Sequence, residues 1–185
     1  GSSKVYREPH GVVLILSPWN YPFQLAIDPL VGAVGGGNCA VVKPGSYAPE
    51  TAKAIAAVIA AAFDPGHVTT VLGGRAENTL LLDQKFDYIF FTGSQDVGKT
   101  VMAKAAEHLT PVSLELGGKS PCILAEGANL TLAAKRIAFG KTVNAGQTCV
   151  APDYLLIRER DKAEFVRHYQ ASIEACYGAD PLQYP

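Results

Sequence analysis

The sequence lacks the features that mark several large classes of proteins. Its 185 residues carry 16 Lys and Arg against 17 Asp and Glu, and no run of like charge forms a basic stripe. The longest apolar run, residues 54–63, is rich in alanine and too short to cross a bilayer. We therefore expect neither nucleic acid nor a membrane as a partner of this segment.

Cysteine is scarce and widely spaced. Cys39, Cys122, Cys149 and Cys176 include no C-x-x-C pair, and no signal-peptide pattern opens the sequence. This spacing indicates neither a metal site nor a disulfide framework, and a reducing, cytoplasmic compartment is expected. The chain opens with GSS and stops at GADPLQYP without a closing element, so we expect an internal fragment of something longer.

Short β-rich runs alternate with alanine-rich helical runs in the first two thirds of the chain. The expected strands are 11–17, 39–43, 68–72, 88–92 and 112–116. The expected helices between them are 24–35, 48–63, 75–82 and 95–108. Nearly continuous apolar strands that are joined through helices are typical of parallel sheets covered on both faces. We predict an α/β fold, a Rossmann-like open parallel sheet with flanking helices.

The same alternation repeats after Gly117 and Gly118, which interrupt both periodicities. The repeat consists of strand 122–125, helix 130–143, strand 154–158 and helix 161–176, with a cysteine-containing loop before the second strand. We therefore predict two domains, residues 1–116 and residues 117–185.

Residues 93–100, GSQDVGKT, match the P-loop pattern of nucleotide triphosphatases, in which Lys99 would reach phosphates and Thr100 would hold magnesium. The loop would follow the fourth strand, and no strand ends in the aspartate that such a metal site needs. Helix capping by Ser94 alone is a second interpretation. A third is a dinucleotide site, where Gly93 and Gly98 would let the backbone approach a diphosphate at a helix N-terminus.

Three polar residues follow or end expected strands, where parallel α/β sheets bind ligands. Asn20 lies in the stiff turn SPWNYPF and could stabilise an oxyanion, although turn asparagines often bond only their own backbone. Lys43 could donate to ribose hydroxyls or be a solvated strand end. Glu115 alternates with leucines, so its carboxylate need not enter the core, and it could act as a general base.

Five motifs occur in one order along the chain: PWNYP at 18–22, VVKP at 41–44, FFTGS at 90–94, LELGGKSP at 114–121 and GQTC at 146–149. In the order and spacing of these motifs the chain resembles the NAD(P)-dependent aldehyde dehydrogenase superfamily. The sequences of the motifs are most similar to those of the class 3 or fatty-aldehyde-type members. The resemblance runs from about Val5 to Pro185. It implies an aldehyde as substrate, NAD or NADP as cofactor, and a homodimer or tetramer for the complete enzyme.

The resemblance also implies roles for single residues. Cys149 would attack the aldehyde, Asn20 would stabilise the oxyanion, and Glu115 would activate the water that hydrolyses the thioester. We expect Cys149 to be the only readily alkylated thiol among the four cysteines. The cofactor side of the site would consist of Trp19, Lys43, Ser46, Gly93, Ser94 and Gly98.

Ser46 departs from the family pattern K-P-S-E, since this chain reads KPGS where a ribose-binding glutamate is usual. Its loss predicts use of NADP as well as NAD. The later motif that would hold the nicotinamide ribose lies beyond Pro185, so we expect the chain alone to have little activity. A nucleotide-binding module without turnover is the alternative function, and the P-loop triphosphatase is a distant third.

Overall fold

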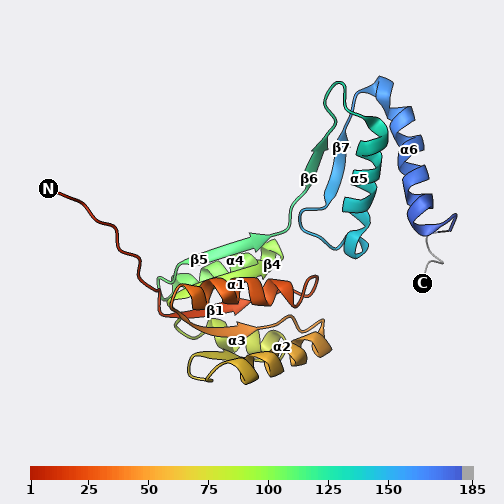
Figure 1. Cartoon of the computed structure of the whole chain (residues 1–185). Helices are drawn as coiled ribbons and strands as arrows, with labels where there is room; N and C mark the ends of the chain where they lie inside the picture. The colour runs from red at the N-terminus through yellow and green to blue at the C-terminus, as the bar shows by residue number, and fades with distance from the viewer. Residues whose placement is uncertain (181–185) are drawn as a thin grey trace. The chain divides into compact units, whose positions relative to one another are not determined.

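A computed structural model describes residues 1–180 (Figure 1). The chain forms two compact units, of which the first spans Gly1–Leu116 and the second begins at Gly117. Residues 181–185, at the end of the predicted second domain, lie outside the described residues.

The first unit contains a five-stranded sheet in which every neighbouring pair is parallel. The strands are β1 (Val12–Leu16), β2 (Cys39–Lys43), β3 (Val68–Thr70), β4 (Tyr88–Gly93) and β5 (Val112–Leu116). Their order in the sheet is β3-β2-β1-β4-β5. The predicted open parallel sheet is therefore confirmed, although β3 ends two residues earlier than expected.

Four helices connect these strands: α1 (Gln24–Gly35), α2 (Pro49–Ala62), α3 (Arg75–Leu82) and α4 (Gln95–Ala106). Each agrees with its predicted range to within two residues. The helices divide between the two faces of the sheet, because successive side chains of a strand point to opposite faces. Val13 and Ile15 pack in one cluster with residues of α1 and α2. Leu14 and Leu16 pack in another with residues of α3 and α4.

These two clusters make β1 the centre of the core. Leu14 and Ile15 are completely buried, and burial of one such side chain stabilises the fold by about 1.5–3 kcal/mol. From β1 the chain passes through β2 to β3 at one edge, and it then continues on the other side of β1 with β4 and β5. This reversal of direction creates a gap between connections at the carboxyl ends of β1 and β4, where open α/β sheets bind ligands.

The second unit pairs two parallel strands, β6 (Ser120–Ile123) and β7 (Pro152–Leu156). Helix α5 (Leu130–Thr142), a short 3₁₀ turn η1 (Val143–Gly146) and helix α6 (Glu159–Tyr177) complete it. Both strands and α6 begin two residues before their predicted starts.

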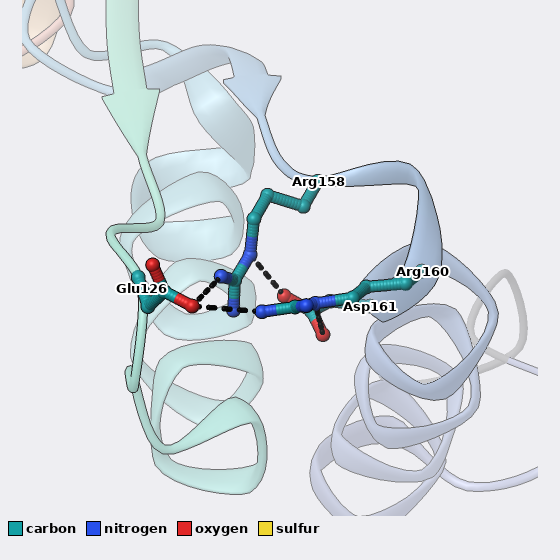
Figure 2. A network of polar contacts seen from close by, with 4 residues as sticks. All are labelled: Glu126, Arg158, Arg160 and Asp161. Atoms are coloured by element: carbon teal, nitrogen blue, oxygen red, sulfur yellow. Dashed lines mark hydrogen bonds and ion pairs between the residues drawn. The ribbon is translucent and has the colours of Figure 1, made fainter.

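A polar network joins the end of β6 to the start of α6 (Figure 2). Glu126 accepts from Arg160 at 2.8 Å and also pairs with Arg158, whose Nε donates to Asp161 at 2.9 Å. The two carboxylates raise the pKa of Arg158 above its ordinary value. Phe165 is the buried residue of α6 and is only 6% exposed.

Candidate functional site

The loop after β1 is held against the loop after β2. Ser17 donates its backbone N–H to Lys43 O at 3.1 Å, which extends the strand pairing by one step. A Cβ added to Gly45 would lie 2.8 Å from the backbone of Pro18, so glycine is required where the loops touch. This contact brings the loop of Trp19, which is 47% exposed, beside the loop of the exposed Ser46.

Asn20 follows Trp19 in this loop and is half-buried. The structure places Trp19, Asn20 and Ser46 at the same edge of the first unit, the carboxyl edge of the sheet.

Lys43 is the last residue of β2 and is only 3% exposed. The interpretation of Lys43 as a solvated strand end is therefore wrong. Its Nζ donates to Pro44 O at 2.9 Å. Burial lowers the pKa of Lys43, and the negative charge of Glu77 partly opposes this effect.

Glu77 was not among the expected site residues. It occupies the third position of α3, and its Oε2 accepts from the backbone N–H of Gly74 at 2.6 Å. The N–H groups of Glu77 and Gly74 lower its pKa, and the positive charge of Lys43 contributes further. A glutamate three residues into a helix is a sequence signal of helix capping. That signal predicts a role within α3 and does not predict the interaction of Glu77 with Lys43.

Gly93 ends β4, and Ser94 caps α4 by accepting from the backbone N–H of Val97 at 3.4 Å. Gln95 to Thr100 are all helical, so no loop winds around a phosphate as the P-loop interpretation requires. The Lys99 ammonium lies 3.6 Å from an Asp96 carboxylate oxygen in the same helix. The P-loop interpretation is therefore wrong, because the residues from Gln95 to Thr100 continue as a regular helix directly after the Ser94 cap.

Gly93 and Gly98 both have a packing reason to lack a side chain. A Cβ at Gly93 would lie 2.5 Å from the ring of Phe91, and one at Gly98 would lie 2.8 Å from Leu116. Gly98 is buried between α4 and β5, whereas the start of α4 at Ser94 is exposed. Of these residues, Ser94 and the first turn of α4 are open to a ligand.

The sheet register brings these residues close together. Leu16 is opposite Lys43 on one side and opposite Phe91 on the other. Because neighbouring strands lie about 4.8 Å apart, Lys43 and the end of β4 are roughly 10 Å apart. A buried cation and the N-terminus of a twelve-residue helix thus lie at one edge, which suits a ligand with a ribose at one end and a diphosphate beside it.

Glu115 lies one strand further along, opposite Thr92 in the register of β4 and β5. It is exposed, and by alternation it shares a face with Ser113, whose hydroxyl bonds to the Tyr88 hydroxyl. The carboxylate can therefore reach solvent.

Cys149 lies in the second unit, in a turn closed by a hydrogen bond from Ala151 N–H to Thr148 O at 3.1 Å. Its side chain is exposed. The turn follows three residues in the left-handed region: Asn144 at φ 53°, Ala145 at φ 54° and Gly146 at φ 78°. Gln147 ties this strained segment together, because its side-chain amide donates to Asn144 O at 2.9 Å.

The other cysteines differ in exposure. Cys39 and Cys122 are half-buried. Cys176, which lies in α6, is exposed, and so is Cys149. Exposure therefore does not single out Cys149, and the expectation that Cys149 is the only readily alkylated thiol stays a prediction. All four cysteines are free.

Within residues 1–180, no helix combines the length and apolar character that a membrane span requires. No three side chains of His, Cys, Asp or Glu in this part of the chain gather into a group that could hold a metal ion.

Comparisons with known proteins agree with one another. The family model described as the aldehyde dehydrogenase family matches residues 1–184. Aldehyde dehydrogenase family 3 member B1 of Bos taurus is 50% identical over 184 residues, which cover 100% of this chain and 39% of the relative. The chain thus spans about two fifths of that protein.

Solved structures give the same result. Staphylococcus aureus AldH in a substrate-bound state has a TM-score of 0.92 and 47% identity, and the similarity covers 96% of this chain and 39% of AldH. A Mycobacterium tuberculosis aldehyde dehydrogenase complexed with NAD⁺ has a TM-score of 0.85 and 37% identity, covering 91% of this chain and 35% of that one.

Proposed function

Because this chain belongs to the aldehyde dehydrogenase family, we propose that it carries the cofactor-binding domain and the nucleophile of an enzyme that oxidises an aldehyde to a carboxylic acid. In this assignment residues 1–116 bind the cofactor and residues 117–185 begin the catalytic domain. The observation that carries the proposal is the exposed thiol of Cys149 in a constrained turn, within a chain that matches the family along its whole length.

Cys149 performs the first chemical step. Its thiolate attacks the carbonyl carbon of the aldehyde, and the carbonyl oxygen becomes an oxyanion of a tetrahedral thiohemiacetal. The side-chain amide of Asn20 and the backbone N–H of Cys149 donate to this oxyanion. Preorganised donors of this kind are worth several kcal/mol in the transition state, because they need no reorganisation as charge develops.

Glu115 performs the last step. When bound, the nicotinamide would supply the two-electron oxidation, and an acyl group would then remain on the Cys149 sulfur as a thioester. Glu115 takes a proton from a water molecule, and the resulting hydroxide attacks the thioester carbon. The carbon–sulfur bond breaks, the carboxylic acid leaves, and the Cys149 thiolate is restored.

NAD or NADP is the cofactor in this proposal. Lys43 would donate to the hydroxyls of the adenosine ribose, and Trp19 and Ser46 would border the same space. The diphosphate would be held at the first turn of α4 beside Gly93 and Ser94, a turn that Gly98 supports by its close packing on Leu116. The free thiols support a cytoplasmic location, where such thiols stay reduced.

The alternative function is a nucleotide-binding module without turnover. The exposed start of α4 and the buried Lys43 would serve either function equally. The exposed Cys149 favours the enzyme, since a binding module needs no constrained thiol.

The test uses the full-length gene product that carries this sequence. It would be mixed with a medium-chain or aromatic aldehyde and either cofactor, and absorbance of the reduced nicotinamide would be followed. We expect oxidation by the unaltered protein and none by Cys149→Ala, with cofactor affinity retained. Cofactor binding without oxidation by the unaltered protein would establish the binding module instead.

A further inference from the structure

Glu77 is fixed in one orientation by the glycine pair that precedes α3. Its Oε2 accepts from Gly74 N–H at 2.6 Å. Gly73 has φ +139°, and a Cβ at this position would overlap the Glu77 carboxyl carbon. The carboxylate therefore lies directly against the backbone of Gly73, where the positive φ and the close approach both favour glycine.

This glycine pair lies beside the end of β2. Val42 is opposite Thr70 in the register of β2 and β3, and Val71 donates its N–H to Val42 O at 2.9 Å. The residue after Val71 therefore passes the carboxyl end of β2, which is formed by Lys43. The Glu77 carboxylate and the Lys43 ammonium thus belong to the same corner of the sheet edge.

The charges of the two groups interact at this corner. Glu77 opposes the lowering of the Lys43 pKa by burial, and Lys43 adds to the lowering of the Glu77 pKa by the N–H groups of α3. Each group thereby favours the charged form of the other. A negative charge is consequently held within electrostatic reach of the ammonium that would bind ribose.

We propose that Glu77 determines cofactor choice: its carboxylate, held against Gly73 and Gly74 beside Lys43, repels a phosphate on the ribose 2'-oxygen and favours a free 2'-hydroxyl. This inference rests on the proposed cofactor site. It changes the expectation drawn from Ser46, because the charge absent at position 46 is supplied from α3. The cofactor preferred by this chain is then NAD.

The test measures affinity for two adenosine nucleotides, and it needs no catalysis. Adenosine 5'-monophosphate carries a free 2'-hydroxyl, and adenosine 2',5'-bisphosphate carries the second phosphate. Both would be titrated calorimetrically against this chain. Glu77→Gln keeps an oxygen that can accept from Gly74 N–H and removes the charge, whereas Glu77→Asp keeps the charge.

Removal of the charge should raise the affinity for the bisphosphate relative to the monophosphate by about tenfold at low ionic strength, and less at high salt. Glu77→Asp should leave the ratio within about threefold of the original. The matched control is Glu107→Gln, which makes the same charge change at the C-terminal end of α4, where Glu107 pairs with Lys104.

The outcomes separate the two proposals. Binding of both nucleotides with a ratio that Glu77→Gln does not alter would overturn the role of Glu77 and leave the cofactor site in place. An equal change in Glu107→Gln would also overturn it, since any surface charge would then suffice. Failure of the unaltered chain to bind either nucleotide would overturn the cofactor site together with this inference.

Discussion

At the residue scale, each proposed site residue depends on a neighbour that fixes its position. Lys43 is buried and donates to Pro44, and the carboxylate of Glu77 balances its charge. Cys149 follows a segment in which Ala145 adopts a left-handed conformation that costs a non-glycine residue about 1–2 kcal/mol. The segment that precedes Cys149 is therefore held in its conformation at an energetic cost.

The strain at Ala145 can be measured. Ala145→Gly should raise the free energy of unfolding by about 1 kcal/mol, because glycine adopts this conformation without the Cβ clash. Ala133→Gly in the regular helix α5 is the control and should lower it by about 1 kcal/mol. Chemical denaturation of the chain measures both. Equal destabilisation by the two changes would mean that the turn is not strained.

The Glu77 carboxylate should also stabilise the fold in a pH-dependent manner. Because its pKa in the fold is below the ordinary value of 4.5, its contribution is present above pH 4.5 and is lost as the pH falls through the lowered pKa. The stability difference between the unaltered chain and Glu77→Gln should therefore shrink as the solution is acidified. Denaturation curves collected from neutral to acidic pH test this, and a difference that is constant with pH would contradict it.

Thiol reactivity gives a third prediction at this scale. Cys149 and Cys176 are both exposed, so iodoacetamide should label both faster than the half-buried Cys39 and Cys122. Peptide mapping after brief labelling measures the order. In the full-length protein, a bound aldehyde should protect Cys149 and leave Cys176 unchanged. Protection of Cys176 alone would contradict the assignment of the nucleophile.

At the element scale, the sequence was sufficient for the types of element and their approximate bounds. Apolar runs and alanine-rich periodicity identify strands and helices because those patterns reflect burial, which the structure reproduces. The interpretation of residues 93–100 shows the limit. The same residue types can form a P-loop or a capped helix. Only the helical backbone conformation from Gln95 to Thr100 distinguishes the two structures.

The Lys43 to Glu77 relation was beyond sequence reasoning for a different reason. The two residues are neighbours only because β3 pairs with β2 and α3 starts directly after a glycine pair. A pattern within one segment contains no information on such a neighbour. By contrast, the rule on ligand sites in parallel sheets concerns the ends of single strands. The sequence alone could therefore identify Asn20, Lys43 and Glu115 as candidates.

The packing of α6 supplies an element-scale prediction. Phe165→Ala should destabilise the chain by about 3–5 kcal/mol, because it removes a buried ring and leaves a cavity. Glu126→Gln removes the centre of the polar network in Figure 2, yet the Glu126 side chain is 78% exposed and the change should cost less than about 1 kcal/mol. Thermal unfolding of both variants measures the difference. A larger loss from Glu126→Gln would show that the network, rather than Phe165, anchors α6.

At the scale of the whole molecule, the chain divides into a unit with the proposed cofactor residues and a unit with the proposed nucleophile. It spans 39% of the bovine relative, so we propose that further residues complete the substrate site of the working enzyme. We expect this chain alone to bind adenosine nucleotides but to oxidise aldehydes at least tenfold more slowly than the full-length protein, since a misplacement of about 1 Å can cost a hundredfold. Parallel assays of reduced cofactor compare the two, and equal rates would contradict this expectation.

The covalent state of Cys149 during the reaction tests the central claim most directly. The full-length protein with Glu115→Gln would be mixed with aldehyde and cofactor, quenched in acid, and digested for peptide mass spectrometry. We predict an acyl group of the mass of the aldehyde less one hydrogen on the peptide that contains Cys149, because acylation proceeds while hydrolysis is slowed. An unmodified Cys149 under conditions in which the unaltered protein oxidises the aldehyde, or an acyl group on Cys176 instead, would contradict the account.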